Sequence, residues 1–140
     1  PAARGLSPLK LQRALRFIDE HIAAAISVAD LAGTAHMSLF HFARMFKQSL
    51  GVPPRVYLTR LRMAKACDLL ERTDLPITEI ALEVGYSSNQ VLARVFLKHM
   101  RLSPSDYRRA VRDPVRRDES QTKNILFYQA LSPYLIIPDF

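Results

Sequence analysis

The sequence has one cysteine and four glycines among its 140 residues, and it contains no long apolar run. A single cysteine excludes an intrachain disulfide and favours a reducing compartment. The scarcity of glycine excludes a collagen-like repeat and leaves no glycine-rich loop for a nucleotide phosphate. The apolar runs span only a few residues, and no basic stretch leads into an apolar one. We therefore expect neither a membrane span nor a signal peptide.

Acidic residues are missing from two long segments. The chain carries 20 Lys and Arg against 13 Asp and Glu, which gives a net charge of +7. Residues 31–67 and 84–105 contain basic side chains but no Asp or Glu. Such segments form a surface of one sign that suits a polyanion. A basic surface without any partner explains the charge alone equally well.

Apolar residues recur with helical spacing between residues 7 and 112, and no alternating strand pattern is present. We therefore expect an all-α fold of about seven helices. They should cover residues 8–24, 28–34, 38–50, 54–72, 77–84, 88–100 and 104–112. Serine is a favoured N-cap residue, and Ser7, Ser27, Ser38 and either Ser87 or Ser88 stand at expected helix starts.

The sequence repeats itself after about 50 residues. Phe42, Arg44, Phe46, Pro54 and Tyr57 recur 50 positions later as Leu92, Arg94, Phe96, Pro104 and Tyr107. Each copy consists of a short helix, a tight turn, a longer basic helix, a proline and a tyrosine, which is the pattern of a helix-turn-helix. The small residues Ala29, Ala32, Gly33 and Ala81 are expected to let the two helices of each copy approach closely.

The longer helix of each copy carries polar side chains suited to DNA. Arginine can bind two acceptors of guanine, asparagine or glutamine can pair with adenine, and an exposed phenylalanine can contact a thymine methyl group. A serine at a helix start suits a phosphate oxygen. Two ordinary helical hairpins packed as a bundle are the alternative. The doubling of the motif and the absence of acidic residues favour DNA.

Residues 38–57, SLFHFARMFKQSLGVPPRVY, and residues 85–107, GYSSNQVLARVFLKHMRLSPSDY, resemble the signature of the AraC/XylS family of bacterial transcription regulators. The resemblance covers about residues 7–112, including the helix YLTRLRMAKACDLL. It implies two helix-turn-helix subdomains at about 8–51 and 76–112, joined by a connecting helix at about 54–72. It also implies a sequence-specific DNA-binding regulator. Its recognition helices, at about 38–50 and 88–100, would enter successive major-groove segments about one helical turn apart.

The resemblance also assigns roles to single positions. The residues that it places against bases are Phe40, Ala43, Arg44, Asn89, Gln90, Ala93 and Arg94. Those that it places near phosphates are Ser38, His41, Lys47, Ser88, Lys98, Ser103 and Ser105. Arg101 departs from the family pattern, because glycine is common there. Either its turn is less left-handed, or Arg101 adds a basic contact.

No catalytic, metal-binding or cofactor-binding residues are expected, so the protein should not be an enzyme. His36 and His41 are five positions apart and do not share a helical face, and Cys67 lies on an apolar stripe where burial is expected. The family implies promoter DNA as the partner and the bacterial cytoplasm as the location. Most members carry a further sensing or dimerising domain. The sequence is therefore either a monomeric DNA-binding fragment, dimerising through an absent domain, or a short regulator.

The last 28 residues, 113–140, differ from the rest in charge and pattern. Ile125–Tyr128 and Tyr134–Ile137 are apolar and aromatic, and they predict either short strands or an extended tail. We assign this tail no role, and docking onto a partner or onto the domain itself is a hypothesis. RNA polymerase is a further candidate partner. Exposed acidic residues away from the DNA face, Asp68, Glu71, Asp74 and Glu83, could contact it.

Overall fold

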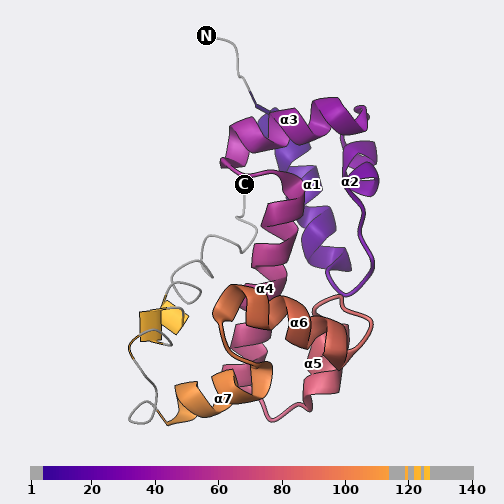
Figure 1. The fold of residues 1–140 in the computed structure, drawn as a ribbon. Coiled ribbons are helices and arrows are strands. Elements are labelled where there is room, and N and C mark those ends of the chain that lie inside the picture. Colours follow the sequence, from indigo (N-terminus) through magenta and orange to yellow (C-terminus); the bar gives the residue numbers. More distant parts are fainter. Residues whose placement is uncertain (1–4, 114–118, 120–121, 124, 127–140) are drawn as a thin grey trace. The chain divides into compact units, whose positions relative to one another are not determined.

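The computed structural model describes residues 5–113 together with residues 119, 122, 123, 125 and 126. Residues 5–113 form seven helices and no strand (Figure 1). These helices are α1 (Pro8–His21), α2 (Val28–Thr34), α3 (Leu39–Leu50), α4 (Pro54–Arg72), α5 (Ile77–Glu83), α6 (Asn89–Met100) and α7 (Pro104–Arg112). The chain divides into two compact units, with the boundary between Arg60 and Leu61 inside α4. The expected all-α class is confirmed, and none of the described helices is long and apolar enough to span a bilayer.

Serine side chains begin five of these helices. The hydroxyls of Ser7, Ser27, Ser38, Ser88 and Ser103 each accept a hydrogen bond from the backbone N–H three residues later. At α2 the bond is reciprocal, because the Asp30 carboxylate accepts from the Ser27 N–H at 2.9 Å. These hydrogen bonds to Ser27 lower the pKa of Asp30. The structure thus selects Ser88 rather than Ser87 as the cap of α6.

Helix α1 ends three residues earlier than expected, at His21. The His21 imidazole stacks on Phe17, with ring centroids 4.2 Å apart, and its Nδ1 lies 2.9 Å from the Phe17 carbonyl oxygen. This contact lies in the last turn of the helix, where α1 ends. Apolar spacing through Ile22 gave no sign of this contact.

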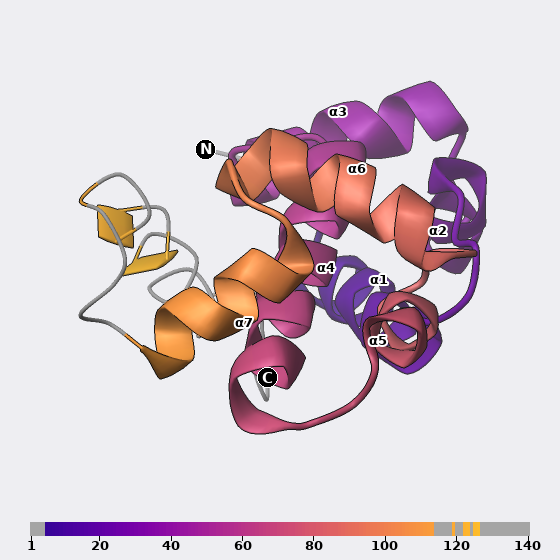
Figure 2. The same ribbon diagram turned by 60° about the horizontal axis from the view of Figure 1, so that its bottom comes forward.

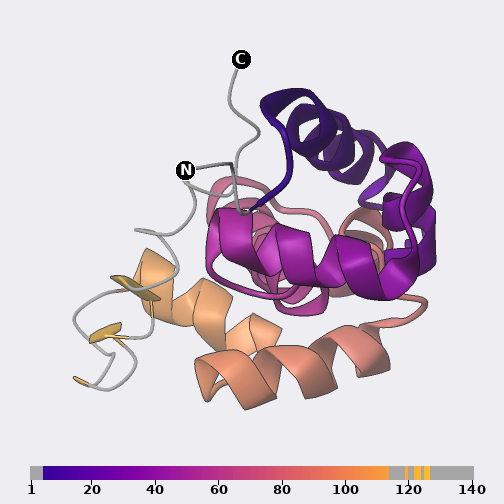
Figure 3. The same ribbon diagram turned by 90° about the horizontal axis from the view of Figure 1, so that it is seen from above.

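The first unit packs α1, α2 and α3 around two phenylalanines of α3. Helix α2 contacts both α1 and α3. Figure 3 shows these three helices in the indigo and purple colours of the first third of the chain. Phe42 and Phe46 have no exposed surface, and Phe46 meets Tyr57 of α4 edge to face at 5.5 Å. The Leu6 N–H donates to Ser49 Oγ at 2.8 Å, which fastens the segment before α1 to the last turn of α3.

The second unit repeats this packing with α5, α6 and α7 (Figure 2). Phe96 of α6 meets Tyr107 of α7 edge to face, again at 5.5 Å. The core of the second unit also contains Leu92 and Met100 of α6, together with Ile125, which follows α7 in the sequence. Residues 125 and 126 are helical, so strands or an extended tail were a wrong expectation for these two residues. Residues 127, 128 and 134–137 lie outside the described part of the chain.

The small residues of the short helices behave differently from expectation. Ala32 and Ala81 are buried and allow close helix packing, as predicted. Ala29 and Gly33 are exposed instead, and a Cβ atom added to Gly33 would meet no heavy atom within 4 Å. The prediction for these two residues is wrong, because both lie on the solvent side of α2.

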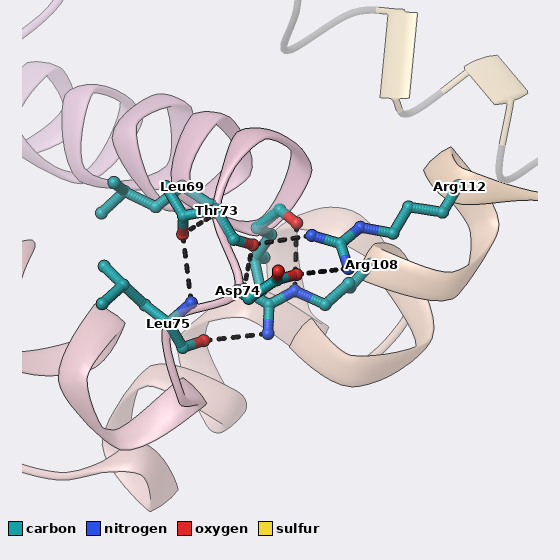
Figure 4. Close-up of polar contacts among 7 residues, drawn as sticks. Leu69, Thr73, Asp74, Leu75, Arg108 and Arg112 are labelled. Atoms are coloured by element: carbon teal, nitrogen blue, oxygen red, sulfur yellow. Dashed lines mark hydrogen bonds and ion pairs between the residues drawn. The ribbon is translucent and has the colours of Figure 1, made fainter.

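Two arginines of α7 hold the turn between α4 and α5 (Figure 4). The guanidinium of Arg108 donates hydrogen bonds of 2.9–3.0 Å to the carbonyl oxygens of Leu70, Thr73 and Leu75. Arg112 donates to Thr73 O at 2.7 Å and pairs with Asp74 at 2.9 Å. The last carbonyl groups of a helix have no partner within it, and the fork of donors on Arg108 supplies one.

Replacing Arg108 with alanine should lower the free energy of unfolding by about 2–4 kcal/mol, because three main-chain acceptors lose a charged donor together. The neighbouring Arg109 is a matched control. It forms an exposed ion pair with Asp106, and its replacement should cost less than about 1 kcal/mol. Urea unfolding of both variants tests the difference. Equal losses would contradict the role of Arg108.

Candidate nucleic-acid interface

Helices α3 and α6 each bury one side and expose the other. Phe42 and Phe46 fix the inner side of α3, and Leu92 and Phe96 fix that of α6. Successive residues of an α-helix are rotated by about 100°, so residues one or two positions away from these anchors turn toward solvent. Most of the predicted contact residues lie at such positions.

The expected contact residues of α3 are mostly accessible. Phe40 is 84% exposed, and His41, Arg44 and Lys47 are also exposed. Ala43 is half-buried, so it offers little surface to a ligand. Phe40 thus presents a large apolar surface to solvent on the same helix as these polar and charged side chains.

Helix α6 presents a comparable set. Gln90, Arg94 and Lys98 are exposed, whereas Asn89 and Ala93 are half-buried. The Asn89 side-chain amide donates to Thr78 Oγ1 of α5 at 3.4 Å. Part of its hydrogen-bonding capacity is therefore engaged within the unit. Thr78 was not among the predicted site residues, and no local sequence pattern connects it with a residue eleven positions later.

The predicted phosphate-binding serines include three helix caps. Ser38, Ser88 and Ser103 accept backbone N–H groups at 3.3, 3.2 and 3.1 Å respectively. A hydroxyl that accepts one hydrogen bond still has a proton to donate, so capping leaves each able to bind a phosphate oxygen. Ser105, in the first turn of α7, is exposed.

The cations of α3 and α6 keep their charge for an external partner. No ion pair joins Arg44, Lys47, Arg94 or Lys98 to another described residue. Arginines at the end of α4 and in α7, in contrast, form ion pairs with Asp68, Asp106 and Asp74. Helices α3 and α6 thus both present positive charge that no described residue pairs, on the sides that face solvent.

Arg62 departs from this pattern. It lies in the first acid-free segment, but it is half-buried and its guanidinium carbon lies 5.6 Å from the centre of the Tyr86 ring. Burial raises the pKa of Tyr86, and the nearby Arg62 charge opposes this shift. This cation stabilises the turn before α6. Its charge alone did not reveal that role.

Both units adopt left-handed backbone at two equivalent positions. The turn before the recognition helix has His36 (φ 54°) in one unit and Gly85 (φ 97°) in the other. The residue after that helix is Gly51 (φ 82°) or Arg101 (φ 65°). The expectation of a less left-handed turn at Arg101 is therefore wrong. Its N–H donates to Leu97 O at 2.9 Å, and this way of ending a helix requires left-handed geometry.

The described residues show no group of three or more His, Cys, Asp or Glu side chains that could hold a metal ion. Cys67 is 3% exposed and lies in the core of the second unit. Burial raises the pKa of its thiol to about 12. This position fits a small core residue rather than a nucleophile.

Residues 31–110 match the model of a helix-turn-helix domain family. The lactose operon transcription activator of Staphylococcus xylosus is 36% identical over 98 residues, which cover 70% of this chain and 35% of that protein. The chain spans about a third of the length of the curated relatives that it matches.

Solved structures of domains from regulatory proteins are also similar to this chain. The C-terminal domain of AraT, a response regulator from Geobacillus stearothermophilus, is 39% identical with a TM-score of 0.70, covering 75% of this chain and 87% of that one. The DNA-binding domain of AdpA, a global transcriptional factor, was solved in complex with a target DNA. It is 31% identical with a TM-score of 0.69, covering 75% of this chain and 96% of that one.

The Cys67 thiol should not react with a thiol reagent such as DTNB while the protein is folded. With a pKa of about 12, it holds roughly one part in ten thousand as thiolate at pH 8, and its burial blocks access. Unfolding in guanidinium chloride should release one reactive thiol. Rapid reaction of the native protein at pH 8 would contradict the buried position.

Proposed function

The chain belongs to the AraC/XylS family of helix-turn-helix transcription regulators, and from this premise we propose that residues 7–112 are a module that binds promoter DNA. Two recognition helices, α3 and α6, would read successive major-groove segments about one helical turn apart. The observation that most strongly supports this is the repeated exposure of unpaired cations on two acid-free helices. The connecting helix, at about 54–72, joins the two reading units.

The proposal has two classes of contact, one with the bases of DNA and one with its phosphate backbone. Phe40, Ala43 and Arg44 of α3 face bases, as do Asn89, Gln90, Ala93 and Arg94 of α6. Arginine supplies two donors to guanine, and the Phe40 ring supplies apolar contact with a thymine methyl group. Asn89 also donates to Thr78 Oγ1, which holds its amide in one orientation before DNA arrives. Specificity at Ala43 and Ala93 is limited to apolar contact, because alanine has no hydrogen-bonding group.

The second class anchors the module on the backbone. Lys47, Lys98 and His41 are exposed cations or donors, and Ser38, Ser88, Ser103 and Ser105 stand at helix starts. Neutralising phosphates releases counterions, so most of the affinity should come from this sequence-independent contact and fall with salt.

The proposal extends to partners and place of action. The module acts without enzymatic chemistry and binds DNA as a monomer in the bacterial cytoplasm, and any dimerisation would use a domain outside this sequence. Asp68 and Asp74 are engaged in ion pairs with Arg72 and Arg112. Glu83 and the 53% exposed Leu82, both in α5, therefore form the better candidate contact for RNA polymerase.

Enrichment of targets from a randomised duplex pool of about 25 bp tests the central proposal. We expect two conserved blocks about one helical turn apart. Arg44→Ala should relax preference at one base position of one block and Arg94→Ala at one position of the other, each at a cost of about 1–3 kcal/mol on the selected site. Equal losses on selected and random DNA would show that these arginines bind only phosphates. A single enriched block would contradict reading by both helices.

Lys98→Ala should weaken binding to all duplexes to a similar degree, because Lys98 is assigned to the backbone. The slope of log affinity against log salt concentration should become shallower by about one unit. Fluorescence anisotropy titrations at several salt concentrations measure this slope. An unchanged slope would remove Lys98 from the interface.

A further inference from the structure

Arg101 occupies a backbone conformation that suits glycine better than arginine. Its φ of 65° and ψ of 16° lie in the left-handed region, where a Cβ atom crowds the main chain. Histidine tolerates this region better than most residues, so His36 is the less unusual of the two left-handed side chains. The fold requires left-handed geometry after α6, but it does not require a side chain there.

The first unit shows that the position equivalent to Arg101 does not need a side chain for folding. Its equivalent residue is Gly51, which ends α3 with the same type of hydrogen bond, here to Lys47 O at 2.7 Å. A Cβ added to Gly51 would meet no heavy atom within 4 Å. The space beside this position in the first unit is therefore open at the Cβ, although no side chain stands there.

The Arg101 side chain is likewise not used within the described part of the chain. It is exposed, and no hydrogen bond or ion pair joins its guanidinium to another described residue. Strained backbone that contributes nothing to packing is typical of functional sites, where the side chain has a role outside the fold. The surroundings of Arg101 indicate which role.

Arg101 lies within the basic end of the second unit. Lys98 precedes it by three residues and Ser103 follows it by two, and residues 84–105 contain no acidic side chain. The Arg101 N–H bond to Leu97 O fixes the backbone from which the side chain extends. A guanidinium suits a phosphodiester because its planar donors can bind two phosphate oxygens at once.

We propose that Arg101 binds a phosphate of duplex DNA at the end of the second recognition helix. Gly51 gives the first unit no such contact, so the two units anchor to the backbone unequally. The inference rests on the proposed DNA-binding function and adds to it a residue and a difference between the units. It also makes the stability of the folded protein and its affinity for DNA depend on one side chain, so a single substitution can leave stability unchanged or raise it while lowering affinity.

Arg101→Gly tests this directly. Glycine relieves the left-handed strain, so the melting temperature should stay unchanged or rise by up to about 5 °C. Affinity for selected and random duplexes should fall together by about 8-fold at 0.1 M salt, and the salt slope should become shallower by about 0.9. Calorimetry and anisotropy titrations on the same samples give both results.

Three further variants separate the effect of the Arg101 charge from the effect of its backbone strain. Arg101→Lys keeps the charge and the strain, and should retain the salt slope. Arg101→Ala should lose affinity as Arg101→Gly does, without the gain in melting temperature. Arg72→Gln removes one positive charge at an arginine that pairs with Asp68, and should leave the slope unchanged.

Wild-type affinity and slope in Arg101→Gly would overturn the inference. So would a loss confined to the selected sequence, because that would indicate a base contact. If Arg72→Gln made the salt slope equally shallow, the change in slope would reflect only the loss of net charge. That result would also overturn the inference. Failure of the proposed function is distinct, because wild-type protein would then show no salt-dependent binding to any duplex.

Discussion

The contact on which each unit depends is the edge-to-face packing of a recognition-helix phenylalanine against a tyrosine of the next helix. Phe46 meets Tyr57 and Phe96 meets Tyr107, both at 5.5 Å between ring centroids. Each pair buries two large aromatic surfaces and adds a favourable ring orientation. Because Phe46 and Phe96 have no exposed surface, they fix the rotation of α3 and α6 about their axes. The outward positions of both helices follow from that constraint.

Much of this fold could be predicted from sequence because its signals are local. Serine caps, prolines in first turns and apolar stripes each act within a few residues, and they gave the bounds of α2, α4 and α7 correctly. The errors came from a side-chain contact within one helix and from solvent exposure. Helix α1 ends at His21, whose ring contacts Phe17, and Gly33 faces solvent although its small size suggested close packing. Periodicity alone contains neither fact.

The candidate site could be predicted only in part, because charge does not distinguish arginines with different roles. Arg108 and Arg112 bind main-chain carbonyl groups, and Arg62 stacks on Tyr86. Arg44 and Arg94 are exposed without an ion pair to any described residue. All five contribute equally to a net charge of +7, yet only the last two are positioned for an external anion. The distinction depends on helices that lie next to one another in the fold, such as the end of α4 and α7.

The two units share a backbone plan but distribute its conformational cost differently. The plan needs a left-handed residue before and after each recognition helix, and glycine meets that need without strain. The first unit has its glycine after the helix and the second has it before, so each keeps one side chain in a strained position. Folding would favour glycine at all four positions. The side chains that remain, His36 and Arg101, are both exposed and flank α3 and α6, so burial of the side chain does not offset the strain at either position.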